Sequence, residues 1–230
     1  MNNFADSSLF IGTIITLAGY QIGLALYKKT RFALLNPILT GMTFTACLLL
    51  FLKIDYKSYN ESAQYISYLL TPATICLALP LYENLRLIKK HCKAISAGIL
   101  MGTASSTVSV YLLSLIFKFS HVHYVTFLPK SVTTAIGIGI CEELGGFINI
   151  AVISIIFSGI IGYTIAPALM NFFRIKEPIA VGIAIGSASH AIGTAKAMEM
   201  GETEGAMSGL AIALTGILTV FAVPLAAMWI

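Results

Sequence analysis

Charged residues are scarce in this sequence. Of its 230 residues, 14 are Lys or Arg and 10 are Asp or Glu, which together make 10% of the chain, whereas an ordinary soluble domain has about 25%. Hydrophobic residues make up 57%, and the charges fall in short clusters between long apolar stretches. This pattern excludes a soluble enzyme and a nucleic-acid-binding module. It predicts an all-α, polytopic integral membrane protein embedded in a lipid bilayer.

Residues that commonly serve catalysis or metal binding are also few. The only two aspartates, Asp6 and Asp55, flank apolar runs, so no Ser-His-Asp arrangement is indicated. The four cysteines show no CxxC spacing and are interpreted as small packing residues. The sequence contains neither an HExxH motif nor a P-loop. We therefore expect no enzymatic activity, no cofactor and no metal site.

Long apolar stretches are what the sequence has in abundance. Most are close to the roughly 20 residues that a helix needs to cross a bilayer, and they predict about seven transmembrane helices within one membrane domain, 1–230. The runs are residues 9–27, 33–52, 63–82, 94–117, 148–170, 178–198 and 205–230. Residues 131–147 are short and rich in Gly and Thr. They predict a re-entrant hairpin or a broken helix, which is tolerated at membrane depth only beside protein or a water-filled cavity.

The basic clusters predict the orientation in the membrane. Residues 28–31, 86–93 and 174–176 carry most of the positive charge, and such loops usually lie on the cytoplasmic side. This assignment requires 131–147 to enter and leave on one side of the membrane. The acidic loop 199–204 is expected on the opposite, outer side.

A weak internal repeat runs through the chain. Pro37 and Pro178 share similar neighbours at an offset of 141, and Pro80 and Pro224 at an offset of 144. The candidate repeats are 9–82 and 148–226, linked by 94–147. Internal repeats are typical of secondary transporters. The basic loops favour parallel repeats, whereas many transporters have inverted ones, so the sequence leaves the relation between the repeats open.

The densest polar cluster within an apolar run lies between Gly186 and Lys196. Ser187, His190 and Thr194 share one face of a continuous helix, and ionisable residues at membrane depth usually face a cavity or a partner. The alternative is close helix packing, with His190 bonded to a backbone carbonyl. We predict a substrate site with His190 as a proton carrier, formed by Ser187, Ser189, His190, Gly193, Thr194 and Lys196.

Two further clusters are candidates for the same site. In Thr71-Pro72-Ala73-Thr74 the proline breaks the helical ladder and frees backbone groups for a ligand, unless it makes only a kink. Pro129 followed by hydroxyl residues predicts a helix start whose N–H groups suit a carboxylate, with Ser131, Thr133 and Thr134 in contact. Glu142 ends that stretch as a second proton-carrier candidate, or lies in solvent at the membrane surface.

These clusters resemble the LrgB/CidB family of bacterial membrane proteins. The matching stretches are 71–82, 128–136 with Glu142 and Gly145-Gly146, and 182–197 with Ser189-His190-Ala191-Ile192-Gly193. The resemblance covers nearly the whole chain, which is also similar to the C-terminal half of the plastid glycolate/glycerate translocator. It implies a carrier of small carboxylates such as pyruvate, lactate or glycolate. It also implies an antiholin-like role in autolysis and a small partner of the LrgA/CidA type.

Two functions remain open at this point. The first is a proton-coupled secondary transporter of small carboxylates in the bacterial cytoplasmic membrane, a multi-pass protein that forms homo-oligomers. The alternative is an antiholin-like regulator or component of a membrane pore that controls murein hydrolase activity. A simple pore-former needs only short, continuous helices. The long helices with specific breaks in this sequence therefore favour the carrier.

Overall fold

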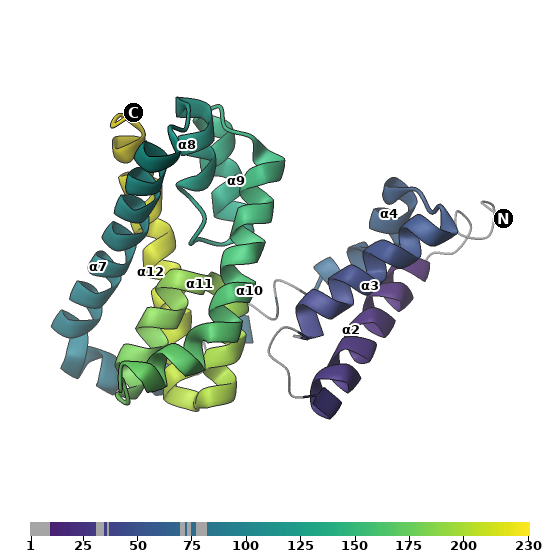
Figure 1. Ribbon diagram of the computed structural model, residues 1–230. Coiled ribbons are helices and arrows are strands. Elements are labelled where there is room, and N and C mark those ends of the chain that lie inside the picture. The colour runs from purple at the N-terminus through teal and green to yellow at the C-terminus, as the bar shows by residue number, and fades with distance from the viewer. Residues whose placement is uncertain (1–9, 31–34, 36, 70–71, 73–74, 77–81) are drawn as a thin grey trace. The chain divides into compact units, whose positions relative to one another are not determined.

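Helices make up all of the regular secondary structure in the part of the chain that the computed structural model describes, which is residues 10–30, 35, 37–69, 72, 75–76 and 82–230 (Figure 1). The prediction of an all-helical protein is confirmed. Within these residues, four helices are long and apolar enough, by length and composition, to cross a membrane: Leu85–Phe117, Ile148–Phe172, Pro178–Met200 and Glu202–Ala227. The count of about seven crossings stays a prediction. The chain divides into two compact units, Met1–Cys76 and Leu77–Ile230.

The described residues of the first unit include three helices that pack through small residues. They are α2 (Ile11–Thr30), α3 (Pro37–Leu52) and α4 (Tyr56–Ser67). The Gly12 amide donates to Ser62 Oγ over 2.9 Å, and a Cβ on Gly19 would lie 3.0 Å from the carbonyl oxygen of Gly41. The backbones therefore approach closely at glycines, as is usual between membrane helices.

The second unit begins with a long helix and a short helical hairpin. Helix α7 (Leu85–Phe117) runs to the end of the unit where α8 (His121–Phe127) and α9 (Thr134–Glu143) lie (Figure 1). The Phe147 amide donates to Thr126 Oγ1 over 2.9 Å, which holds the last turn of α8 beside the residues that follow α9. We name residues 128–133, the turn between them, the first tip. The segment predicted to be re-entrant is thus the returning arm of a hairpin that already begins in α8.

Helix α10 (Ile148–Phe172) leads to α11 (Pro178–Met200), which folds back on itself. His190 has φ 41° and ψ −141°, which interrupts the helix. A Cβ on Gly193 would lie 3.3 Å from the carbonyl oxygen of Ile185, whereas residues eight apart in a straight helix are about 12 Å apart. The arms 178–189 and 191–200 are each about half as long as the bilayer core is thick. We name residues 187–190 the second tip.

Contacts with the last helix, α12 (Glu202–Ala227), fix the directions of the two arms. A Cβ on Gly182 would lie 2.7 Å from Met207 Cβ, and one on Gly186 would lie 2.9 Å from Ala211 Cβ, so the first arm runs parallel to α12. Gly205 packs against Met198, and the hydroxyls of Thr194 and Ser208 lie 2.7 Å apart, so the second arm runs antiparallel. The start of the first arm and the end of the second arm therefore lie at the same end of the unit.

This path corrects the predicted orientation of the acidic loop. Residues 199–204 lie at the same end of the unit as 174–176, because α11 turns back at His190 instead of crossing. The N-terminal end of α7 is there as well, since Gly98 packs against Ile183 and Gly102 against Ser187. The basic clusters 86–93 and 174–176 therefore share one end, as their charge predicts, and the acidic loop joins them.

The second unit contains an inverted repeat that the sequence analysis missed. At an offset of 56, Phe117-Lys118 matches Phe173-Arg174, and Ala135-Ile136-Gly137 matches Ala191-Ile192-Gly193. The match extends to backbone geometry, because Lys118 and Arg174 both adopt the left-handed conformation, at φ 53° and 56°. Each copy is a long helix followed by a hairpin, and the hairpins enter from opposite ends. The repeat with an offset of 141 stays a prediction.

Candidate functional site

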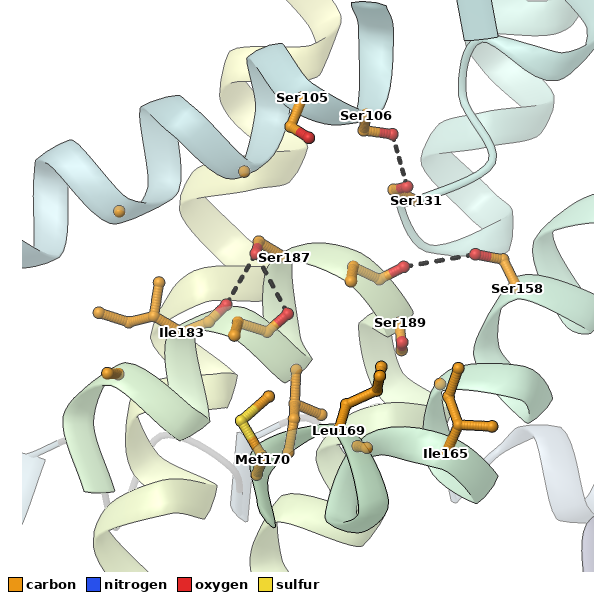
Figure 2. Close-up of a pocket in the computed structure, with 18 of the residues that line it drawn as sticks. Ser105, Ser106, Ser131, Ser158, Ile165, Leu169, Met170, Ile183, Ser187 and Ser189 are labelled. Carbon is orange, nitrogen blue, oxygen red and sulfur yellow. Dashed lines mark hydrogen bonds between the residues drawn. The ribbon is translucent and has the colours of Figure 1, made fainter. Parts of the chain in front are cut away.

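The two tips lie beside a cavity of about 940 Å³ in the second unit (Figure 2). Its walls come from α7, α10, α11 and the first tip. The polar part of the lining consists mostly of hydroxyl groups, those of Ser105, Ser106, Ser109, Ser131, Ser158, Ser187 and Ser189. Irregular backbone at membrane depth is expected to border such a space.

A stripe of small residues on α7 makes room for one wall. Gly98, Gly102, Ser106 and Ser109 recur every three or four positions, so they share a helix face. The hydroxyls of Ser106 and Ser131 form a hydrogen bond of 2.7 Å that joins α7 to the first tip (Figure 2). The wall and the tip are therefore linked directly.

The second tip forms the opposite wall. Ser187 is buried and donates to the carbonyl oxygen of Ile183 over 2.7 Å. The hydroxyl of Ser158 on α10 donates to the carbonyl oxygen of Ala188 over 3.3 Å (Figure 2). Ser189 is 3% exposed, and none of the hydrogen bonds between described residues involves its hydroxyl. A ligand in the cavity could use that group.

Lys130 brings a positive charge to the cavity. Its Nζ lies 3.5 Å from Ser106 Oγ and 3.4 Å from Ser131 Oγ, which are long distances for a charge-assisted hydrogen bond. No carboxylate among the described residues pairs with it. A charge at membrane depth is costly and usually serves a functional site. The other ionisable residues of the lining, His91 and Glu177, lie at the N-terminal ends of α7 and α11.

The cavity extends toward one end of the unit and is closed toward the other. It reaches His91 and Glu177 at the end that carries the basic clusters. At the opposite end a fully packed cluster of α7, α8, α9 and α12 includes Tyr124 and Val223, both 0% exposed. The Tyr124 hydroxyl donates to the carbonyl oxygen of Ala226 over 2.9 Å. The cavity lining thus reaches one end of the unit, and packed side chains fill the other end.

Comparison with known proteins identifies the family. The LrgB-like family profile matches residues 16–229. The chain belongs to the LrgB-like family. It is 34% identical over 218 residues to the antiholin-like protein LrgB of Bacillus subtilis (strain 168), and the match covers 94% of each chain. The protein of the same name from Bacillus mycoides (strain KBAB4) is 35% identical over 217 residues, again 94% of each chain. No solved structure matches.

The predicted resemblance to LrgB/CidB proteins is thereby confirmed. Together with the four long apolar helices, it makes this LrgB-like chain a multi-pass membrane protein of bacteria. Its predicted site residues divide into two groups. Ser131, Ser187 and Ser189 line the cavity, and the others that the structure describes do not. Thr71, Ala73 and Thr74 lie outside the described residues, and Pro72 is exposed.

His190 of the LrgB-like chain holds the second tip against α10 and does not line the cavity. It is 3% exposed, and its Nε2 donates to the carbonyl oxygen of Ile155 over 2.8 Å. A Cβ on Gly159 would lie 2.7 Å from His190 Cε1, so the glycine makes room for the ring. Thr194 donates to the carbonyl oxygen of His190 over 3.0 Å. This geometry matches the packing alternative that the sequence left open.

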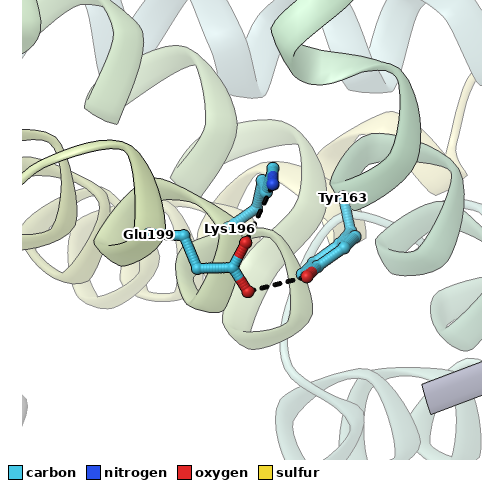
Figure 3. A network of polar contacts seen from close by, with 3 residues as sticks. All are labelled: Tyr163, Lys196 and Glu199. Atoms are coloured by element: carbon cyan, nitrogen blue, oxygen red, sulfur yellow. Dashed lines mark hydrogen bonds and ion pairs between the residues drawn. The ribbon is translucent and has the colours of Figure 1, made fainter. Parts of the chain in front are cut away.

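Lys196 is neutralised away from the cavity (Figure 3). Its Nζ lies 2.8 Å from Glu199 Oε2, and the Tyr163 hydroxyl donates to Glu199 Oε1 over 2.8 Å. The ammonium also lies 5.3 Å from the centroid of the Tyr163 ring. The network joins the second arm of α11 to α10. Gly193 permits the close approach of the two arms, because its Cβ position is 3.0 Å from Ile185 Cγ2.

The remaining predicted residues lie on or beside α9. Thr133 is the N-cap but makes no capping hydrogen bond, Thr134 begins the helix, and Glu142 is exposed near its end. Sequence analysis missed the lining residues Lys130, Ser105, Ser106, Ser109 and Ser158. The signals were present, since Lys130 interrupts an apolar stretch and residues 104–109 carry four hydroxyls. Among the described residues no three His, Cys, Asp or Glu gather as a metal site would require.

Proposed function

We propose that this LrgB-like protein is a secondary carrier of small carboxylates such as pyruvate, lactate or glycolate. The observation that carries the proposal is the cavity beside two hairpin tips, closed at one end by packed side chains. Broken or re-entrant helices in inverted repeats commonly build the substrate sites of secondary transporters near the middle of the membrane. A cavity open to one side is one of the two states that such a carrier alternates between.

The inverted repeat suggests how the carrier would reach its second state, in which the cavity is open at the opposite end. If the two copies exchange their conformations, the α8–α9 hairpin opens the end near Tyr124 while α11 closes the end near Glu177. A pore needs both ends open at once. The closed end near Tyr124 therefore favours a carrier over a pore.

The charge of the lining supports an anionic substrate. Lys130 is the one described cation beside the hydroxyl-lined part of the cavity, and it has no carboxylate partner there. The proposal still includes coupling to protons, although neither predicted proton carrier, His190 or Glu142, lines the cavity. His190 donates to a backbone carbonyl, and Glu142 is exposed on α9.

The second candidate function is antiholin-like regulation of a membrane pore. Its support is the name of the relatives, antiholin-like protein LrgB, at 34% identity over 94% of the chain. This function would require a membrane partner of the LrgA/CidA type, and a homo-oligomer would suit it as well. A carrier activity of the chain alone would need neither.

Uptake into liposomes separates the two. The purified chain is reconstituted alone, and radiolabelled lactate is offered outside while carboxyfluorescein is trapped inside. The carrier proposal expects saturable lactate uptake without loss of the dye. Unsaturable flux with dye leakage supports the pore, and lactate uptake equal to that of empty liposomes contradicts the carrier.

A further inference from the structure

We infer that Lys130, together with the hydroxyls of Ser106 and Ser131, is the site that binds the carboxylate group of the substrate. The inference rests on the proposed function and adds the atoms that recognise the anion. It also implies that the site takes one negative charge.

The first support is the unmet bonding capacity of the ammonium. A lysine ammonium has three N–H donors and no acceptor. The two contacts to Ser106 and Ser131 are 3.5 and 3.4 Å long, and the two hydroxyls already share a hydrogen bond of 2.7 Å. A carboxylate oxygen at about 2.8 Å would bind the ammonium more strongly than either hydroxyl does.

The second support is a comparison with the other lysine near this part of the unit. Lys196 has a carboxylate at 2.8 Å and an aromatic ring beneath its ammonium. Lys130 has neither among the described residues, although it lies on a hairpin tip within the membrane domain. Long basic side chains near helix ends can reach the membrane surface, whereas the Lys130 ammonium is directed to Ser106 in the wall of α7. A purely structural lysine would be expected to have a partner like that of Lys196.

The third support is the asymmetry of the repeat. Ser131 of the first tip corresponds to Ser187 of the second at the offset of 56, and both line the cavity. The counterpart of Lys130 is Gly186, which packs against α12. The hydroxyls are thus shared by both repeats, whereas the charge belongs to one. The second tip packs without a charged residue at this position, so packing of a tip does not require Lys130.

The single charge limits the ligand to a monocarboxylate. A second carboxylate would meet serine hydroxyls and apolar side chains, and no further cation among the described residues lines that part of the cavity. Burying an unpaired carboxylate there is unfavourable, because the charge loses its hydration without gaining a partner. The site should therefore prefer lactate to malonate, and it should not bind lactamide, which has the same shape without the charge.

The test measures binding separately from transport. Thermal unfolding of the detergent-purified chain is followed with and without sodium lactate, with lactamide and sodium malonate as comparison ligands, at constant ionic strength. A ligand that binds the folded state raises the melting temperature. We expect lactate to stabilise the wild type and Lys130→Arg, and we expect Lys130→Gln to lose this effect. Lys196→Gln is the matched control, and its response to lactate should equal that of the wild type.

The same variants are then assayed for lactate uptake. Lys130→Gln should raise the apparent KM by about tenfold to a hundredfold, as loss of a charge-assisted contact predicts. Lys130→Gln should fold well, because it removes an unpaired charge, and its unliganded melting temperature should equal or exceed that of the wild type.

The outcomes distinguish the two proposals. Lactate stabilisation that depends on Lys130 without any uptake supports the site and contradicts the carrier. Uptake with an unchanged KM in Lys130→Gln contradicts the site and leaves the carrier standing. Absence of both binding and uptake overturns both, and equal stabilisation by lactate and lactamide overturns the role of the charge.

Discussion

Replacing Gly159 by alanine should destabilise the second tip. The added Cβ would lie 2.7 Å from His190 Cε1 and 3.0 Å from its Nε2, well inside van der Waals contact. The imidazole must therefore move away from α10, which breaks the 2.8 Å hydrogen bond to the carbonyl oxygen of Ile155. A buried donor and acceptor left without partners cost about 1–3 kcal/mol. The better helix propensity of alanine offsets about 0.5–1 kcal/mol of that loss.

The control for this change is Gly139→Ala on α9. Nothing lies within 4 Å of the Cβ position there, so only the propensity gain remains. For a chain of this size, in which 1 kcal/mol shifts the melting temperature by about 2–4 °C, Gly159→Ala should lower the melting temperature in detergent by up to about 10 °C, and Gly139→Ala should leave it unchanged or raise it. If Gly159→Ala melts with or above Gly139→Ala, the described packing of His190 against α10 is wrong.

Three further predictions follow from the same contacts. Single cysteines at Lys89 and Thr203 should react with an impermeant thiol reagent from one side of the membrane and a cysteine at Lys118 from the other; labelling of positions 89 and 203 from opposite sides would contradict the fold-back of α11. Cysteines at Ser106 and Ser131, whose hydroxyls are 2.7 Å apart, should form a disulfide that abolishes the lactate uptake which the same variant retains when reduced; equal uptake by the oxidised and reduced variant would show that α7 and the first tip need not separate. His190→Ala should lower the melting temperature and leave the pH dependence of uptake unchanged, because the ring bonds a backbone carbonyl; a lost pH dependence would instead support the proton-carrier role.

The sequence predicted those residues of the site that are polar within an otherwise apolar segment. Hydroxyl residues after Pro129 and around Ser187 stand out because the surrounding segments are apolar, and Ser131, Ser187 and Ser189 do line the cavity. The helical character follows from the same apolar runs. These features depend on local sequence alone, so no knowledge of neighbouring helices was needed.

The fold-back of α11 could not be predicted in this way. No proline marks the break, and His190 is a residue that rarely adopts φ 41°. The turn is held by distant partners, the carbonyl oxygen of Ile155 on α10 and the packing of both arms on α12. The sequence pattern also favoured Lys196 over Lys130 as a substrate-binding residue, because neighbouring residues in the sequence do not show which lysine has a carboxylate partner. Glu199 decides that difference.

Counterflow separates a carrier from a pore, because only a protein that alternates between two one-sided states exchanges solute across the membrane in this way. Liposomes that contain the purified chain are loaded with unlabelled lactate and diluted into a trace of labelled lactate. We predict a transient accumulation of label above its equilibrium level, with a lower peak at equal protein content in Lys130→Gln than in Lys196→Gln. Label that only approaches equilibrium, at a rate independent of the lactate inside, would contradict a carrier and indicate a pore.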